Sequence, residues 1–287
     1  MEMNELRYFL AVSQTENVQR ASENINVSAG SLSKAIARLE SELGVKLFNR
    51  VGRGITLTEE GHFLTKKASA ILNLETEVKL SILGQEASFK AILGANETLL
   101  SHFGVELAQK IKDLYPNSSI ELVGLNHSSL LTKLADGEVN LGLSTQEPRD
   151  DFDYKKIAEV KFHTVVSKGH PLYKKVKRNI EISIEEILEY DFVVSKNNIL
   201  GKTSANQSAD GWRDDKFRRK IPYITQSLKT LESLVKSGKA LAYLPDYMIV
   251  NSDYEIVNIL GCPYQCKQKV YLISRNKKEL SWINQIF

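Results

Sequence analysis

Hydrogen-bond donors and cations gather in two short stretches near the start of this chain. The first stretch carries serine hydroxyls, an ammonium and a guanidinium, on Ser28, Ser31, Ser33, Lys34 and Arg38. The second carries Arg50 and Arg53, and the neighbouring Gly52 and Gly54 allow a tight exposed turn. Such groups donate to phosphate oxygens and to acceptor atoms on base edges. Together they predict a surface that binds double-stranded DNA.

Two short helices and a hairpin would have to position these donors. Apolar side chains at helical spacing predict two helices that close over one small core, at Val18, Ala21, Ile25, Val27, Leu32 and Ile36. Asn26 stands at the corner between them, where asparagine tolerates left-handed backbone, and Ser28 is a natural N-cap for the second helix. The basic hairpin follows Gly44, and this order predicts a winged helix-turn-helix. An ordinary helical hairpin packed in a protein core is the alternative interpretation.

The distribution of charge favours DNA binding. The second helix and the wing, counted over residues 24–39 and 43–58, contain five charged residues that are all basic: Lys34, Arg38, Lys46, Arg50 and Arg53. Glu40 and Glu42 fall between these stretches, and we expect them to face away from the duplex. Residues 1–84 nevertheless contain ten Lys and Arg against ten Glu, and the whole chain carries a net charge of +3. Non-specific affinity should therefore be modest and steeply dependent on salt.

Size and composition narrow the class of protein. A chain of 287 residues is long enough for two or three domains, and 42% hydrophobic with 25% charged residues is typical of a soluble globular protein. No apolar run reaches membrane-spanning length, and residues 1–10 lack the pattern of a signal peptide. The two cysteines, Cys262 and Cys266, are too few for a disulfide framework. These features predict a cytoplasmic protein that does not enter a membrane.

A long helix should follow the wing. Thr58 can cap it, Glu59 and Glu60 suit its positive end, and it should run to about residue 83. Apolar residues form one stripe near heptad spacing, at Leu64, Ala68, Ile71, Val78 and Ile82. We expect this helix to pair with a copy of itself, the alternative being a plain helix that lies on the next domain.

The rest of the chain alternates between strands and helices. Strands predicted at residues 91–95, 120–125 and 139–144, with helices between them, indicate a parallel sheet. A second α/β unit begins with a strand near residues 162–167, and a late strand follows at 270–274. This predicts two lobes with a ligand cleft between them, at the carboxyl ends of the strands. The expected domains are the winged helix-turn-helix at 1–58, the dimerisation helix at 59–84 and an effector domain at 89–287. Its lobe I would comprise 89–161 and 265–287, and its lobe II 162–264.

Over its entire length the chain resembles the LysR-type transcriptional regulators. The resemblance is carried by Leu6-Arg7-Tyr8-Phe9, Leu32-Ser33-Lys34, Leu43-Gly44-Val45-Lys46-Leu47-Phe48-Asn49-Arg50 and Leu57-Thr58-Glu59-Glu60-Gly61. Weaker matches in the same order are His170-Pro171-Leu172 and the stretch at 238–245. The resemblance implies a homodimer or homotetramer whose C-terminal half, built like a periplasmic binding protein, senses a small-molecule effector between two lobes. RNA polymerase is a further candidate partner, and no cofactor is implied.

The chain departs from the family pattern at the start of the recognition helix. Family members often carry Gln and Pro where this chain has Ala29 and Gly30. Small residues cannot make bidentate contacts to bases, so direct readout should depend on Ser31, Ser33, Lys34 and Arg38. We therefore expect a relaxed operator that is read partly by its shape.

The resemblance also implies an effector site at helix starts and strand ends that face the cleft. The corresponding residues here are Asn96, Glu97, Thr98, Asn126, Ser128, Ser129, Ser144, Thr145, Ser195, Asn197, Thr203 and Gln226. Glu97 stands where a small hydroxyl residue is common, and its carboxylate would repel an anion. Either Thr98 and Ser129 bind an anionic effector instead, or the effector is neutral or cationic.

Other reactive side chains have plainer interpretations. His163 and His170 lie apart from other metal-binding residue types, so no metal site is expected. Cys262 and Cys266 are expected to be unreactive thiols, with a redox pair as the alternative. The mixed-charge run at 212–220 predicts a solvated loop or helix, or else a lid or subunit contact. A constitutive DNA-binding protein without effector response, and an enzyme on a binding-protein-like fold, remain as alternative functions.

Overall fold

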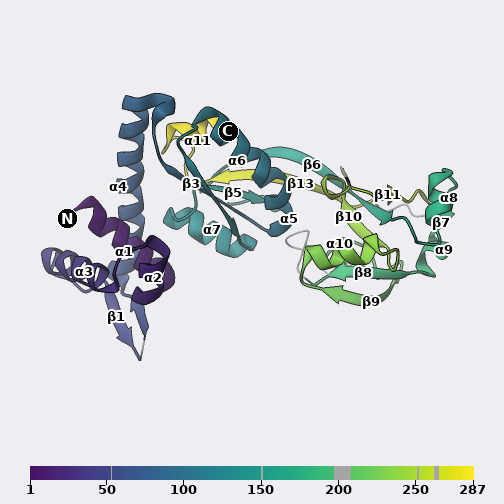
Figure 1. Cartoon of the computed structure of the whole chain (residues 1–287), viewed down its shortest axis with the longest axis horizontal. Helices are drawn as coiled ribbons and strands as arrows, with labels where there is room; N and C mark the ends of the chain where they lie inside the picture. The colour runs from purple at the N-terminus through teal and green to yellow at the C-terminus, as the bar shows by residue number, and fades with distance from the viewer. Residues whose placement is uncertain (53, 150, 197–207, 251, 262–264) are drawn as a thin grey trace.

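A winged head, a straight stalk and a two-lobed domain follow one another along the chain (Figure 1). The computed structural model describes residues 1–52, 54–149, 151–196, 208–250, 252–261 and 265–287. Within these ranges, no helix combines the length and the apolar character that crossing a bilayer would require.

The head contains the predicted helix-turn-helix. Its helices are α1 (Met3–Thr15), α2 (Val18–Ile25) and α3 (Ala29–Leu43). Asn26 has a positive φ of 54° at the corner, and the Ser28 hydroxyl accepts a hydrogen bond from the Ser31 amide, so the predicted turn and cap are confirmed. The small core beneath the helices buries Val12, Ala21, Leu32 and Ile36.

The wing is the hairpin of β1 (Phe48–Val51) and β2 (Gly54–Leu57). Glu40 holds the segment that leads into the wing. The Glu40 carboxylate accepts hydrogen bonds from the Leu47 amide at 2.9 Å and from the Lys46 ammonium at 2.6 Å. Burial alone would raise the pKa of Glu40, but these hydrogen bonds lower it below the ordinary value. Glu40 therefore works as an internal acceptor that orders the wing.

The stalk is α4 (Glu59–Leu83), capped by the Thr58 hydroxyl as predicted. The predicted stripe lies on one face, but its first half, Leu64, Ala68 and Ile71, packs against the head beside α1. Only Val78 and Ile82 of that stripe are exposed, at 51% and 75%. Only the second half of the predicted stripe is therefore available for pairing with a second copy, because the head covers the first half. An exposed apolar row instead winds along α4 through Phe63, Ala70, Leu74, Val78 and Ile82.

Lobe I is built on three parallel strands, β3 (Lys90–Ala95), β4 (Ser119–Gly124) and β5 (Leu141–Ser144). Its helices are α5 (Glu97–Leu99), a π-helical turn η2 (Leu100–Gly104), α6 (Val105–Leu114), α7 (His127–Asp136) and α11 (Ser281–Ile286). A short 3-10 turn, η1 (Gly84–Glu86), joins the stalk to this lobe. Trp282 of α11 is buried and stacks on Phe89, which ties the end of the chain to the start of lobe I.

The three predicted strands are parallel, as expected, but the complete sheet is mixed. The late strand β13 (Lys267–Ser274) runs antiparallel to both β5 and the long strand β6 (Asp153–Val166), and β10 (Ala242–Pro245) is antiparallel to β6. The sheet order is β10-β6-β13-β5-β3-β4. One strand, β6, therefore belongs to both lobes, and the expected boundary between residues 161 and 162 falls inside it. Sequence patterns detected only the buried end of β6, because the rest of it is half-exposed.

Lobe II surrounds the far end of β6. Its remaining elements are α8 (Tyr173–Lys177), β7 (Ile182–Ser183), α9 (Ile184–Leu188), β8 (Asp191–Ser195), β9 (Lys220–Thr225), α10 (Leu228–Lys236), η3 (Asp246–Met248), β11 (Glu255–Ile256) and β12 (Ile259–Leu260). β8 and β9 form a separate parallel pair beneath α10 (Figure 1).

The mixed-charge run at 212–220 is largely a loop, as expected, but it is only partly solvated, because Trp212 and Arg219 are buried. The Arg219 side chain is fully buried between Asp210 (Nη1–Oδ2 2.7 Å) and Asp214 (Nη2–Oδ2 2.8 Å). Its guanidinium also packs over the rings of Phe192 and Trp212. Burial alone would raise the pKa of Asp214, but hydrogen bonds from Arg219 and Ser208 lower it. Its stabilising contribution is present at neutral pH and is lost as pH falls through that lowered pKa. The opposite charges in the run neutralise one another, which permits their burial.

Replacing Arg219 by methionine should destabilise the effector domain by about 3–5 kcal/mol, because Asp210 would be left buried without its cation. Urea unfolding of the full-length protein measures the loss. The control is Lys220→Met, which removes an exposed pair with Glu189 and should cost less than about 1 kcal/mol. Equal losses in the two variants would contradict a central role for this buried cluster.

Candidate DNA-binding and effector sites

The recognition helix α3 separates its polar and apolar residues cleanly. Leu32, Ala35, Ile36 and Leu39 are buried against the head. All the predicted donors are exposed: Ser28, Ser31, Ser33, Lys34 and Arg38. The hydroxyls of Ser28 and Ser31 also bond to each other at 2.8 Å, which fixes the first turn.

The cations of the head divide into paired and unpaired groups. Arg38 Nε lies 3.1 Å from the buried carboxylate of Glu5, so α1 holds this guanidinium in place while most of it stays exposed. Lys46 pairs with Glu40. Lys34 and Arg50 form no ion pair with any residue that the structure describes, and both are exposed. Arg53 lies outside the described residues. The sequence could not predict that Glu5 pairs with Arg38, because Glu5 is on another helix, α1.

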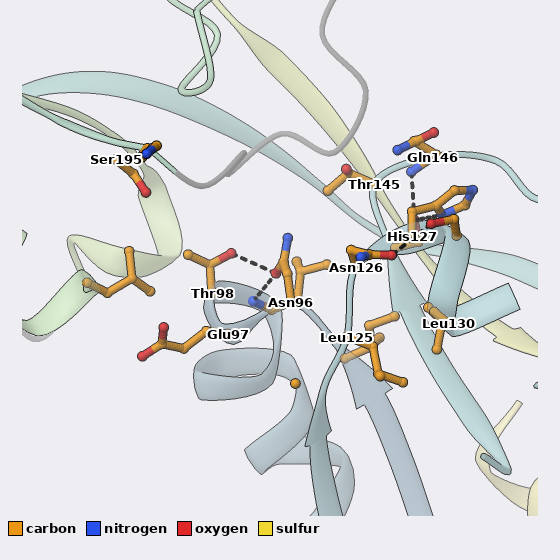
Figure 2. A pocket seen from close by; sticks show the side chains of 17 residues that line it. Asn96, Glu97, Thr98, Leu125, Asn126, His127, Leu130, Thr145, Gln146 and Ser195 are labelled. Carbon is orange, nitrogen blue, oxygen red and sulfur yellow. Dashed lines mark hydrogen bonds between the residues drawn. The ribbon is translucent and has the colours of Figure 1, made fainter. Parts of the chain in front are cut away.

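A cavity of about 740 Å³ lies between the lobes. It forms where β3, β4 and β5 of lobe I end and where β8 of lobe II ends, the usual position for a ligand in such sheets. Figure 2 shows Asn96, Glu97 and Thr98 on one side and Asn126, Thr145 and Gln146 on the other, with Ser195 approaching from lobe II.

Several polar side chains at this cavity already hold the backbone. Asn96 Oδ1 accepts from the Leu99 amide at 2.9 Å, and Asn126 Oδ1 accepts from the Ser129 amide at 2.9 Å. The Thr98 hydroxyl donates to Asn96 Oδ1 and hydrogen-bonds with Tyr247. Burial raises the pKa of this Tyr247 phenol to about 12, so it stays protonated. These groups shape the rim by capping the helices that begin there.

His127 and Ser144 form a second fixed element. His127 Nδ1 lies 2.8 Å from the Ser144 hydroxyl, which also accepts a hydrogen bond from the Gln146 amide at 3.0 Å. Burial lowers the pKa of the His127 imidazole, so this ring is neutral at pH 7. It therefore adds no charge to the cavity.

Among the described residues that line the cavity, two carry a charged side chain, one from each lobe. Glu97 and Lys196 are both exposed, and neither pairs with an opposite charge among the described residues. The apolar part of the wall comes from Leu99, Leu125, Leu130, Leu143 and Leu228. Sequence reasoning missed this apolar wall, because the same leucines also fit an ordinary core.

The predicted effector residues divide into three groups. Those that line the cavity are Asn96, Glu97, Thr98, Asn126, Ser128, Ser144, Thr145 and Ser195. Ser129 and Gln226 are not among its lining residues. Asn197 and Thr203 lie outside the described residues, as does Cys262. Cys266 is buried, and burial lowers the pKa of both His163 and His170. Among the residues described, no group of His, Cys, Asp and Glu is arranged to hold a metal ion.

Comparison with known families gives two matches, one to the head and one to the two-lobed domain. Residues 3–62 match the bacterial regulatory helix-turn-helix protein family of LysR type. Residues 90–282, well over half of the chain, match the LysR substrate binding domain.

Two relatives align with most of this chain at modest identity. The HTH-type transcriptional regulator YybE of Bacillus subtilis is 27% identical over 250 residues, covering 86% of this chain and 83% of YybE. The hydrogen peroxide-inducible genes activator of Haemophilus influenzae is 25% identical over 258 residues, covering 88% of this chain and 82% of that protein.

Solved structures show the same fold. Full-length OxyR from Pseudomonas aeruginosa has a TM-score of 0.64 at 21% identity, covering 100% of this chain and 94% of OxyR. Full-length CbnR in complex with its target DNA has a TM-score of 0.54 at 19% identity, covering 100% of this chain and 97% of CbnR. The head, the two-lobed domain and both family matches establish that this chain belongs to the LysR family of transcriptional regulators, with an N-terminal helix-turn-helix and a C-terminal effector-binding domain.

Proposed function

We propose that the head binds duplex DNA with α3 in the major groove and the wing along the phosphate backbone. The single observation that carries this is the exposed polar face of α3, where Lys34 lies beside Ser31 and Ser33 and has no counter-charge among the residues that the structure describes. Arg38 would reach the duplex from a position fixed by Glu5, and Arg50 would contact phosphates from the wing. Arg53 is proposed for the wing tip on sequence grounds alone. Because its partner is chromosomal DNA, the protein would act in the cytoplasm, and RNA polymerase is a further proposed partner.

Replacing Lys34 by alanine should weaken binding to a selected genomic duplex about tenfold or more, because an exposed unpaired cation leaves the interface. It should also flatten the dependence of affinity on salt. Fluorescence anisotropy between about 50 and 200 mM salt measures both effects.

The matched control is Lys46→Ala, which removes the same charge from a lysine already paired with Glu40. We expect a much smaller loss of affinity in this variant. If Lys46→Ala weakened binding as much as Lys34→Ala does, the assignment of the DNA-facing surface would be wrong.

We further propose that the stalk pairs with a second copy through its exposed apolar row. Leu74 is 65% exposed and Ile82 is 75% exposed, although α4 already packs on the head and on lobe I. Leaving such a row in water is unfavourable, and burying it against an equivalent row would bring two heads to one duplex.

The double substitution Leu74→Glu with Val78→Glu should therefore yield monomers in sedimentation velocity, because four carboxylates would meet in the paired stalks. Val250→Glu is the control, since Val250 is an equally exposed apolar residue on lobe II. A double variant that kept the oligomeric state of the unmodified protein would rule out this pairing face.

The cavity between the lobes is the proposed effector site, and we propose an effector that carries an amine. The Glu97 carboxylate forms no ion pair within the described part of the chain. The Thr98 hydroxyl, in contrast, is hydrogen-bonded to Asn96, and Ser129 does not line the cavity. The alternative of an anion bound by Thr98 and Ser129 thus has less support. The leucines would cover an apolar body, and Lys196 could receive an acidic group at the opposite end of the ligand.

A thermal-shift screen of matched amines and carboxylates, such as phenethylamine against 3-phenylpropionate, should select amines. Calorimetry should then show that Glu97→Gln weakens the best amine about tenfold or more, since it removes one charge-assisted contact. Tight binding of a carboxylate that Glu97→Gln leaves unchanged would exclude this effector class.

A further inference from the structure

Helix α7 connects the effector cavity with the stalk. Its start lines the cavity, through the cap Asn126 and through His127, Ser128 and Leu130. Its end, at Asp136 and the C-cap Gly137, lies against α4. Figure 1 shows α7 beneath the sheet of lobe I, reaching toward the stalk. One helix of ten residues thus touches both functional regions.

The contact at the stalk is close. A Cβ atom added at Gly137 would lie 2.7 Å from the Cβ of Ser69 on α4, so only glycine fits at this approach. Gly137 also has a φ of +74°, which favours glycine. Beside it, Lys66 of α4 lies 3.8 Å from the carboxylate of Asp136.

Arg275 and Glu279 form polar contacts that connect α7 with the stalk. Arg275 donates to the Ala135 carbonyl at 3.2 Å and pairs with Glu279. Glu279 in turn accepts from Asn73 of α4 at 2.9 Å. Further along the stalk, the Ser281 amide donates to Glu77 at 2.8 Å.

These stalk residues form one face of α4, which we call the seam: Lys66, Ser69, Asn73 and Glu77. They recur every three or four positions, so they point in one direction. The exposed row proposed for pairing lies on another face and remains uncovered when the seam is formed. The head covers a third face.

Tight packing leaves α7 little freedom to bend. Leu130 and Leu134 lie on Gly142 of the sheet, where an added Cβ would come within 2.9 Å of Leu134 and 3.0 Å of Leu130. Close-packed interiors do not absorb displacements locally, so a shift at one end of the helix must appear at the other.

We propose that α7 transmits occupancy of the effector cavity to the stalk through the seam. This inference rests on the proposed function and adds the route by which the effector would alter DNA binding. The effector would act by favouring one position of α7 against α4. Because the stalk packs on the head, that position would affect how the head binds DNA. Because coupling between two binding sites is reciprocal, DNA bound at the head should be detected at the start of α7.

Hydrogen–deuterium exchange of the full-length protein tests this with DNA as the only probe. A genomic duplex selected by the protein should change amide exchange at residues 127–131 about threefold or more. The double variant Asn73→Ala with Glu77→Ala should bind the duplex but lose that change. Lys79→Ala is the control on the same helix, because Lys79 pairs within α4 with Glu75 and forms no ion pair across the seam in the described part of the chain.

A second variant, Gly137→Ala, keeps the test decisive if the double variant unfolds, because its methyl group would push the seam apart. Unchanged exchange in β3 would show that each variant is folded. If the unmodified protein binds no duplex, the proposed function fails and the inference fails with it. If the duplex binds but exchange at residues 127–131 does not change, only the role of α7 is overturned. The same holds if the double variant and Gly137→Ala both keep the full change seen in the unmodified protein.

Discussion

The packing of α4 is the constraint on which the rest of this regulator depends. One face of the helix completes the core of the head, another forms the seam with lobe I, and a third keeps an apolar row in water. Because α4 packs on both the head and lobe I, a shift of lobe I against α4 also changes the position of lobe I relative to the head, as long as the head stays on the helix. The position of the recognition helix is thereby linked to the lobe that supplies most of the lining of the proposed effector cavity.

Buried or half-buried carboxylates hold several cations in place, in the head and in lobe II. Glu5 orients Arg38, Glu40 orders the wing and engages Lys46, and Asp210 with Asp214 hold Arg219 inside lobe II. The near-neutral charge of the head follows from this arrangement, because many of its acids serve its own fold. The proposed DNA surface then combines Arg38, which Glu5 holds in place, with Lys34 and Arg50, which form no ion pair among the described residues. Net charge is a poor guide to such a surface.

The sequence predicted local features well and long-range ones poorly. Asn26, Ser28 and Thr58 depend on the chemistry of neighbouring backbone groups, so the turn and both caps could be predicted. The direction of β13, the length of β6 and the burial of Arg219 depend on partners far along the chain. The cavity rim was indicated by the resemblance to the LysR family. Its apolar wall and the contact of Gly137 with Ser69 required coordinates.

A hydroxyl-radical footprint of the full-length protein on a selected genomic duplex tests the central claim most directly. The claim is that two heads, joined through their stalks, each place α3 in a major groove. The account predicts protected segments in pairs, with centres about 10–10.5 base pairs or a multiple of that apart, on one side of the duplex. A single unpaired segment, or no protection even at low ionic strength, would contradict it.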